Sequence, residues 1–416
     1  MNPFLRYAML NTRVLVVGST PDYNEIIYTK YGGETLFLTD KSQSAEWTGF
    51  KPPKKDECLF DLSNHEGAIE AILAHAKAHE ISINGITCFD CEALPLAAKA
   101  AERLNLHFST LSAIENARSK AGSHLLWQKN GVPCPATVRL FSPEDLEKTA
   151  QKAIYPCVIK PATGSGSELV FRVDNPEQTA EKYLYIIDRI ATHPNQRMYP
   201  ICGCTLEQFI DGDEFSCDWV MHEGKAEIIR IAEKVRRDEL SFGTASAYIV
   251  PPSKPVNTDK LKEILVKGAK ALGFESMVAM TDFIIQDDRV YLIEMTPRFG
   301  GDSLPDTVMA SAGFDIFRAA LDYAVTGEIC IPDFWLPAVS VRIIAERAGT
   351  LRKASVMHDH RIISVNIERE EGHRIILPPE NYFSRLLGHV VFRPDEGTDI
   401  RKQIDEIRAK ISVEYA

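Results

Sequence analysis

The sequence lacks the features that mark membrane, secreted and nucleic-acid-binding proteins. No apolar run reaches the about 18 residues that a membrane-crossing helix needs. Basic residues are not in excess, because 47 Lys and Arg stand against 58 Asp and Glu. The N-terminus does not show the basic and apolar segments of a signal peptide. We therefore expect a cytoplasmic protein that has neither a membrane nor a nucleic acid as its partner.

Several familiar site motifs are missing as well. Cys88 and Cys91 form a CxxC pair, but no second pair follows at the spacing of a zinc site, so we expect reduced, structural thiols. The sequence contains no GxxxxGK[ST] phosphate loop, and the turn that begins at Gly18 is not the GxGxxG of a dinucleotide site. Both of these nucleotide sites are therefore disfavoured.

The residues that are present suit an ordinary globular protein with several domains. The 416 residues, 45% of them hydrophobic, suffice for about two to four domains. Near the start, apolar runs at 14–17, 35–39 and 83–89 alternate with helical patterns at 66–79 and 95–104. This alternation predicts an α/β unit with a parallel, doubly wound sheet.

The later sequence mixes helices with antiparallel strands. One helical stretch is expected over 114–129, and the pattern over 204–247 is typical of antiparallel strands. The tail, 338–416, has the pattern of a small α+β unit. Candidate boundaries between these parts fall at the polar stretch 193–200 and at 332–337.

Two strands over 278–295 form a predicted hairpin with unusual charge. If the turn has three residues, Asp282 lies directly opposite Glu294, and a turn of two or four residues breaks this opposition. Neighbouring carboxylates destabilise each other unless a cation or a shared proton offsets them, and Mg²⁺ prefers such ligands. A solvated hairpin face is the alternative. The other face would be apolar, with Phe283, Ile285, Tyr291, Ile293 and Met295.

Three further segments carry candidate ligand groups. Lys160 ends an apolar run, and the Gly/Ser loop 163–167 behind it can present backbone N–H groups to phosphate oxygens, although such a loop is more often simply a turn. The segment 206–214 can offer main-chain groups to a purine edge and Glu214 to a ribose, or it can be a half-buried strand. Arg298 lies four residues beyond Glu294, where a guanidinium can hold a phosphate.

Taken together, these features resemble the ATP-grasp superfamily and above all its carboxylate–amine ligases, with biotin carboxylase and the carbamoyl phosphate synthetase halves as more distant relatives. The matching order is a helix with Lys120, a strand with Lys160, a Glu-x-Phe segment and a carboxylate hairpin followed by an arginine. The resemblance implies a mixed α/β and α+β multidomain fold. Its parts would be a Rossmann-like pre-ATP-grasp domain at 1–112, a two-lobed ATP-grasp domain at 113–335 (lobes 113–200 and 201–335) and a small C-terminal α+β domain at 336–416.

The resemblance also implies roles for individual residues. Lys160 and Arg298 would be the catalytic cations that steady the transferred phosphoryl group. Asp282 and Glu294 would bind the metal, and Thr296, where the family usually has Asn, would contact it directly or through water. The ATP-binding set would be Lys120, Lys160, Thr163, Gly164, Ser165, Gly166, Ser167, Glu207, Gln208, Phe209, Ile210 and Glu214. Apart from the resemblance, residues in or near loops are candidates for contacting a substrate: Arg236, Gly300, Gly301 and Asp302. Solvated surface charge is the alternative for Arg236 and Asp302.

By this resemblance the protein would use ATP and Mg²⁺, or Mn²⁺ in its place, on small-molecule substrates. A carboxylate would become an acyl phosphate, and an amine such as an amino acid would displace the phosphate to give an amide or peptide, ADP and phosphate. Two alternatives stay open: an ATP-dependent carboxylase or carbamoyl-forming enzyme that uses bicarbonate, and a non-catalytic ATP-binding module. The oligomeric state is also open, with a homodimer among the options.

Overall fold

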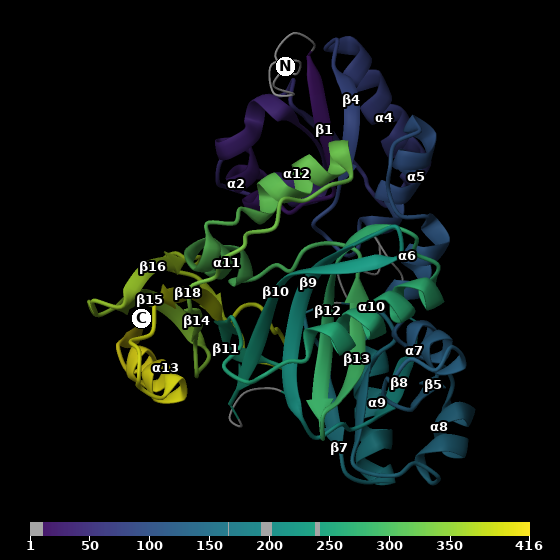
Figure 1. Cartoon of the computed structure of the whole chain (residues 1–416), viewed down its shortest axis with the longest axis vertical. Helices are drawn as coiled ribbons and strands as arrows, with labels where there is room; N and C mark the ends of the chain where they lie inside the picture. The colour runs from purple at the N-terminus through teal and green to yellow at the C-terminus, as the bar shows by residue number, and fades with distance from the viewer. Residues whose placement is uncertain (1–10, 165, 193–201, 238–241) are drawn as a thin grey trace.

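The computed structural model of the chain describes residues 11–164, 166–192, 202–237 and 242–416. Figure 1 shows the N-terminal part (purple) at one end of the molecule, the middle of the chain (teal and green) below it, and the tail (yellow) at one side. Ser165 and the predicted boundary at 193–200 lie outside the described residues.

The N-terminal part is built on a parallel sheet, as the alternating pattern predicts. The strand order is β3-β2-β1-β4, and all three pairings are parallel. The strands are β1 (Thr12–Val17), β2 (Thr35–Asp40), β3 (Glu57–Phe60) and β4 (Ser82–Thr87). The helices are α2 (Pro21–Tyr31), α3 (Lys41–Glu46), α4 (His65–Ala78) and α5 (Leu94–Leu104), with a 3₁₀ turn η1 (Gly32–Glu34).

A second, four-stranded sheet carries the lysine and glutamate of the predicted phosphate and adenine segments. Its order is β5-β8-β6-β7, and its pairings are antiparallel. Lys160 on β6 pairs with Thr205 on β8, two residues before Glu207. The elements are β5 (Thr137–Leu140), α8 (Pro143–Ala150), β6 (Cys157–Pro161), β7 (Phe171–Val173), α9 (Pro176–Ala191) and β8 (Cys204–Gln208).

An eight-stranded sheet forms the centre of the molecule, and it includes strands of the tail. Its order is β13-β12-β9-β10-β11-β14-β18-β16, so three tail strands continue the sheet of the predicted hairpin. The strands are β9 (Asp213–His222), β10 (Lys225–Arg236), β11 (Ala245–Val250), β12 (Met277–Gln286), β13 (Arg289–Thr296), β14 (Ala338–Ile344), β16 (Ile362–Ile367) and β18 (Leu386–Phe392). The separate tail elements are β15 (Gly349–Val356), β17 (Arg374–Ile375), α13 (Ile400–Arg408) and β19 (Ile411–Tyr415).

The predicted helix over 114–129 is in fact two helices. α6 (Leu111–Arg118) ends and α7 (Lys120–Lys129) begins at Ser119, whose backbone is extended. The Ser119 hydroxyl accepts a hydrogen bond from the Gly122 N–H at 3.1 Å, which caps the new helix. The break therefore places Lys120 in the first turn of a helix.

The hairpin β12–β13 has a two-residue turn, so the expected three-residue turn is wrong. Asp287 and Asp288 both have positive φ, as a type I′ turn requires. The opposition of Asp282 and Glu294 is nevertheless confirmed, because the register shifts by one residue at Ile293. A bulge of this kind resets the alternation of side chains. The buried face consequently holds Phe283, Val290, Leu292 and Met295 rather than Tyr291 and Ile293.

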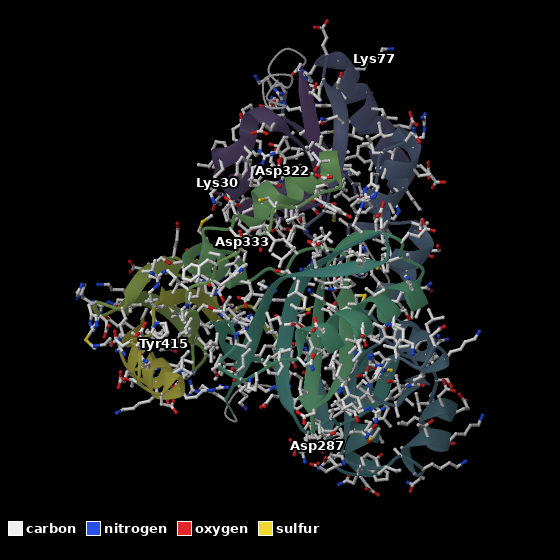
Figure 2. All side chains as sticks on the ribbon, viewed as in Figure 1. Lys30, Lys77, Asp287, Asp322, Asp333 and Tyr415 are labelled. Carbon is white, nitrogen blue, oxygen red and sulfur yellow. The ribbon has the colours of Figure 1, made fainter. Side chains whose placement is uncertain are left out.

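The remaining helices join the parts. α12 (Ile316–Thr326) packs on the N-terminal sheet, where Phe317 and Leu321 share a core with Val16 and Phe37, and Figure 1 shows it lying across β1. α10 (Thr258–Leu272) covers the hairpin, and α11 (Leu304–Ala312) contacts β14. Figure 2 places Asp287, in the hairpin turn, far from Asp322 on α12. No helix within the described ranges is long and apolar enough to cross a membrane.

Candidate functional site

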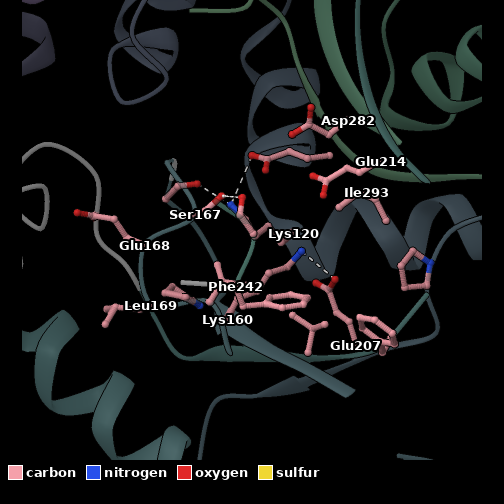
Figure 3. A pocket seen from close by; sticks show the side chains of 18 of the residues that line it. Lys120, Lys160, Ser167, Glu168, Leu169, Glu207, Glu214, Phe242, Asp282 and Ile293 are labelled. Atoms are coloured by element: carbon pink, nitrogen blue, oxygen red, sulfur yellow. Dashed lines mark hydrogen bonds and ion pairs between the residues drawn. The ribbon is translucent and has the colours of Figure 1, made fainter. Parts of the chain in front are cut away.

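A cavity of about 130 Å³ lies between the four-stranded sheet and the hairpin β12–β13 (Figure 3). Its lining is of two kinds. Leu169, Phe209, Phe242, Ile284 and Ile293 are apolar and suit a flat ring. The remaining lining includes Lys120, Lys160, Thr163, Gly164, Ser167, Glu207, Gln208, Ile210, Glu214, Arg236, Asp282 and Glu294, so most of the residues predicted from the sequence meet in this one place.

Lys160 and Glu207 form a buried ion pair on one wall of the cavity. Lys160 Nζ lies 2.8 Å from Glu207 Oε2, and the two side chains are 7% and 3% exposed. Glu207 also accepts a hydrogen bond from the Thr205 hydroxyl at 2.9 Å. Burial alone would raise the pKa of the Glu207 carboxyl, but the Lys160 ammonium outweighs it and holds the pKa below its usual value. Glu207 therefore stays charged and fixes the lysine at the wall.

Lys120 reaches the same cavity from the N-terminus of α7. Its Nζ donates to the Gly164 carbonyl at 2.5 Å and lies 3.4 Å from Glu294 Oε1. The lysine thus links the glycine loop to the hairpin. Burial would raise the pKa of Glu294, but Lys120 and Lys160 outweigh it and lower the pKa. A helix N-terminus that carries a lysine is a favourable place for an anion such as a phosphate.

A lysine that sequence reasoning missed connects the other two carboxylates. Lys234 Nζ on β10 lies 2.8 Å from Asp282 Oδ2 and 3.1 Å from Glu214 Oε1. Arg236, one alternate position further along β10, also pairs with Glu214. Figure 3 shows Asp282 and Glu214 close together on one side of the cavity. The period-two spacing of Lys234 and Arg236 is a signal in the sequence, but only the pairing of β10 with β9 brings them to these acids.

The carboxylates Asp282 and Glu294 are suitable ligands for a Mg²⁺ ion whose other ligands are phosphate oxygens. Asp282 Oδ1 is buried and has no hydrogen-bond partner among the described residues. Burial raises the pKa of Asp282, and Lys234 offsets this only in part. The described residues contain no group of three or more His, Cys, Asp and Glu side chains arranged for a metal. Two protein carboxylates plus substrate phosphates are, however, a usual set for Mg²⁺.

The structure places Arg298 and several predicted neighbours outside this cavity. Arg298 turns toward the N-terminal part, where its Nη2 lies 2.9 Å from the Cys91 sulfur and its Nη1 donates to the Phe299 carbonyl at 2.6 Å. Thr296 is buried opposite Met280 at the end of the hairpin. Asp302 pairs with Arg342, Gly301 approaches Tyr23, and Gly166 abuts Phe383.

A buried pair beneath the hairpin supports the chain that follows Arg298. Arg230 Nε lies 2.8 Å from Asp218 Oδ2, and Asp218 Oδ1 accepts a hydrogen bond from the Gly300 N–H at 2.8 Å. A Cβ on Gly300 would lie 2.5 Å from Arg230 Nη2, so a larger residue here would displace this guanidinium. Sequence reasoning also missed His124, which is fully buried and lies 2.6 Å from the Thr137 hydroxyl and 2.8 Å from the carbonyl oxygen of Ile293 in the bulge.

The cavity combines two lysines, an apolar wall and paired carboxylates, and these groups are chemically suited to a metal-bound nucleoside polyphosphate. Residues 153–306 match the family model described as an ATP-grasp domain. The L-amino acid ligase of Bacillus licheniformis has a similar structure, with a TM-score of 0.77 at 22% identity over 98% of this chain and 99% of that chain.

Two curated proteins show similarity at the level of sequence. Alanine–anticapsin ligase of Bacillus amyloliquefaciens is 25% identical over 316 residues, which is 70% of this chain and 64% of that protein. Human carnosine synthase 1 is 23% identical over 341 residues, which is 75% of this chain and 40% of that protein. The match thus spans less than two thirds of the length of either relative. The match of residues 153–306 to an ATP-grasp domain agrees with the resemblance found in the sequence.

Proposed function

We propose that the protein is an ADP-forming carboxylate–amine ligase that joins small molecules, amino acids among them, through an amide bond. The observation that carries the proposal is the meeting of Lys120 and Lys160 with the opposed carboxylates Asp282 and Glu294 around one cavity. The names of the similar proteins support it, because they describe an alanine–anticapsin ligase, an L-amino acid ligase and a carnosine synthase.

In this proposal each wall of the cavity binds one part of the nucleotide. Lys120 and Lys160 are the ammonium groups that bind the phosphate chain, with the backbone of the loop around Gly164 beside them. Phe209 and Ile210 on the apolar wall contact the base, and Glu214 is the carboxylate within reach of the ribose. Positioning and charge neutralisation, rather than covalent chemistry by the protein, drive a phosphoryl transfer of this kind.

Asp282 and Glu294 would hold the Mg²⁺ of the nucleotide. The ion, when bound, supplies neutralisation of charge on the phosphate oxygens. The ammonium groups of Lys120 and Lys160 bind the phosphates at the same time, so attack by a substrate carboxylate meets less repulsion. Arg298 stands four residues beyond Glu294 and offers two N–H groups, now directed at the Cys91 sulfur. A thiol is a weak acceptor, so a carboxylate or acyl phosphate competes well for this edge of the guanidinium.

The test is phosphate release from ATP in the presence of pooled amino acids, other amines or bicarbonate, followed by mass spectrometry of the products. Release that depends on an amine, together with a condensed product one water lighter than its two substrates, supports the ligase. Release that depends on bicarbonate would favour a carboxylase or carbamoyl-forming enzyme instead. ATP binding without any turnover would favour a non-catalytic ATP-binding module.

A further inference from the structure

Each of the two carboxylates expected to hold the metal is already paired with a lysine. Asp282 Oδ2 lies 2.8 Å from Lys234 Nζ, and Glu294 Oε1 lies 3.4 Å from Lys120 Nζ. Lys234 is held from a second side as well, because Glu214 Oε1 lies 3.1 Å from the same ammonium. The side chain of Lys234 is 12% exposed, so little water competes for these contacts.

The formal charges of the site cancel in this state. Three carboxylates face three cations, and the set is Glu214, Asp282 and Glu294 against Lys120, Lys234 and Arg236. A divalent cation that entered alone would add two positive charges to a mostly buried, neutral cluster. Burial of uncompensated charge is unfavourable, and Mg²⁺ also gives up its water reluctantly.

A nucleotide changes this balance because its phosphates bring the missing negative charge. Lys120 contacts the carbonyl of Gly164 in the loop beside the phosphate wall, so a phosphate chain there draws its ammonium away from Glu294. Phosphate oxygens can likewise take contacts of the Lys234 ammonium and release Asp282. Asp282 Oδ1, which has no partner among the described residues, is then the first oxygen available to the ion.

We propose that Lys234, assisted by Lys120, excludes free divalent metal from the site, so that the metal enters only together with the nucleotide. Lys234 is in this view a positioning residue that selects the metal–nucleotide complex. The inference rests on the proposed function, since it takes the cavity as a nucleotide site. It predicts that the protein without nucleotide binds a divalent cation weakly at Asp282 and Glu294.

The test measures Mn²⁺ binding to the full chain by electron paramagnetic resonance, with and without ADP. For the wild type we expect Mn²⁺ to bind at least about tenfold more tightly with ADP present. Lys234→Met leaves Asp282 and Glu214 without their shared cation, so we expect Mn²⁺ binding without ADP to tighten by about tenfold or more. Lys234→Arg keeps the charge, so its Mn²⁺ binding should stay close to that of the wild type.

Lys254→Met is the matched control, because Lys254 forms an exposed ion pair with Asp213 and its loss should leave Mn²⁺ binding unchanged. Thermal unfolding of each variant shows whether it is folded. Equal Mn²⁺ affinity of the wild type with and without ADP would overturn the inference even if Lys234→Met failed to fold. A folded Lys234→Met protein without tighter Mn²⁺ binding would overturn it too. Absence of ADP binding in any buffer would instead contradict the proposed function.

Discussion

Replacing Lys160 by alanine would show whether this lysine does more than pair with Glu207. The substitution leaves a carboxylate that is 3% exposed without the ammonium 2.8 Å away. Loss of one partner of a buried ion pair costs about 3–5 kcal/mol. The Thr205 hydroxyl at 2.9 Å remains, and His124 Nδ1 lies 3.9 Å away. We therefore expect the free energy of unfolding to fall by about 3 kcal/mol, the lower end of that range.

A double variant separates stability from nucleotide binding. Lys160→Met with Glu207→Gln removes both charges and keeps similar side-chain volumes, so most of the lost stability should return. ADP binding, measured by calorimetry, should stay weakened because the ammonium is still missing. Glu207→Gln alone is the control for any contribution of this glutamate. If the double variant recovered both stability and full ADP affinity, Lys160 would not be a phosphate ligand.

The same substitution should reverse the pH dependence that Glu207 gives to stability. In the wild type, burial would raise the pKa of Glu207, but Lys160 outweighs it and lowers the pKa. A lowered pKa stabilises the fold above the unfolded value of about 4.3, and this is lost as the pH falls through the folded pKa. In Lys160→Ala, burial is the largest effect on the pKa of Glu207 and is opposed by His124 and Thr205. We therefore expect stability to be lost instead as the pH rises above about 4.3. Urea unfolding should thus show a larger deficit at about pH 7 than at about pH 4; a constant deficit would contradict this reasoning.

Three further substitutions test the carboxylate Glu294, the close contact at Gly300 and the guanidinium of Arg298. Glu294→Gln should abolish Mg²⁺-dependent turnover and leave the thermal midpoint nearly unchanged, and retained turnover would contradict the metal assignment. Gly300→Ala should lower the free energy of unfolding by about 1–3 kcal/mol, because its Cβ would lie 2.5 Å from Arg230 Nη2, whereas Gly33→Ala meets no atom within 4 Å and is the control. Arg298→Lys should slow turnover by about tenfold or more with ADP affinity unchanged, since lysine cannot offer the two-pronged contact; unchanged turnover would remove Arg298 from the reaction.

Local pattern was enough to predict several of the regular elements. Three strands of the parallel sheet (β1, β2 and β4) and the helices α4 and α5 follow from apolar spacing, whereas β3 was not predicted. The single helix expected over 114–129 failed because Ser119 has two roles, ending one helix and capping the next. A serine side chain that hydrogen-bonds the backbone competes with a continuous helix at that point, and the spacing of apolar residues does not reveal it.

The sequence did not predict the bulge in the hairpin or the contact between Lys234 and Asp282, because both depend on how the strands pair in the folded sheet. The bulge at Ile293 restores the opposition of Asp282 and Glu294 although the turn is shorter than expected, and nothing in the hairpin sequence marks it. Lys234 reaches Asp282 only because β9 lies between β10 and β12 in the sheet. The residues expected in the cavity were found by their order along the chain, whereas their counter-ions depend on strand order in space.

The continuous sheet from β13 to β16 limits how the molecule can close on a ligand. Its strand pairing runs from the hairpin that carries Asp282 and Glu294 into the tail, so we expect the hairpin and the tail strands to move together. The four-stranded sheet with Lys160 shares no strand with that sheet. Under the proposed function, closure over a ligand would therefore be a movement of the four-stranded sheet relative to the eight-stranded sheet.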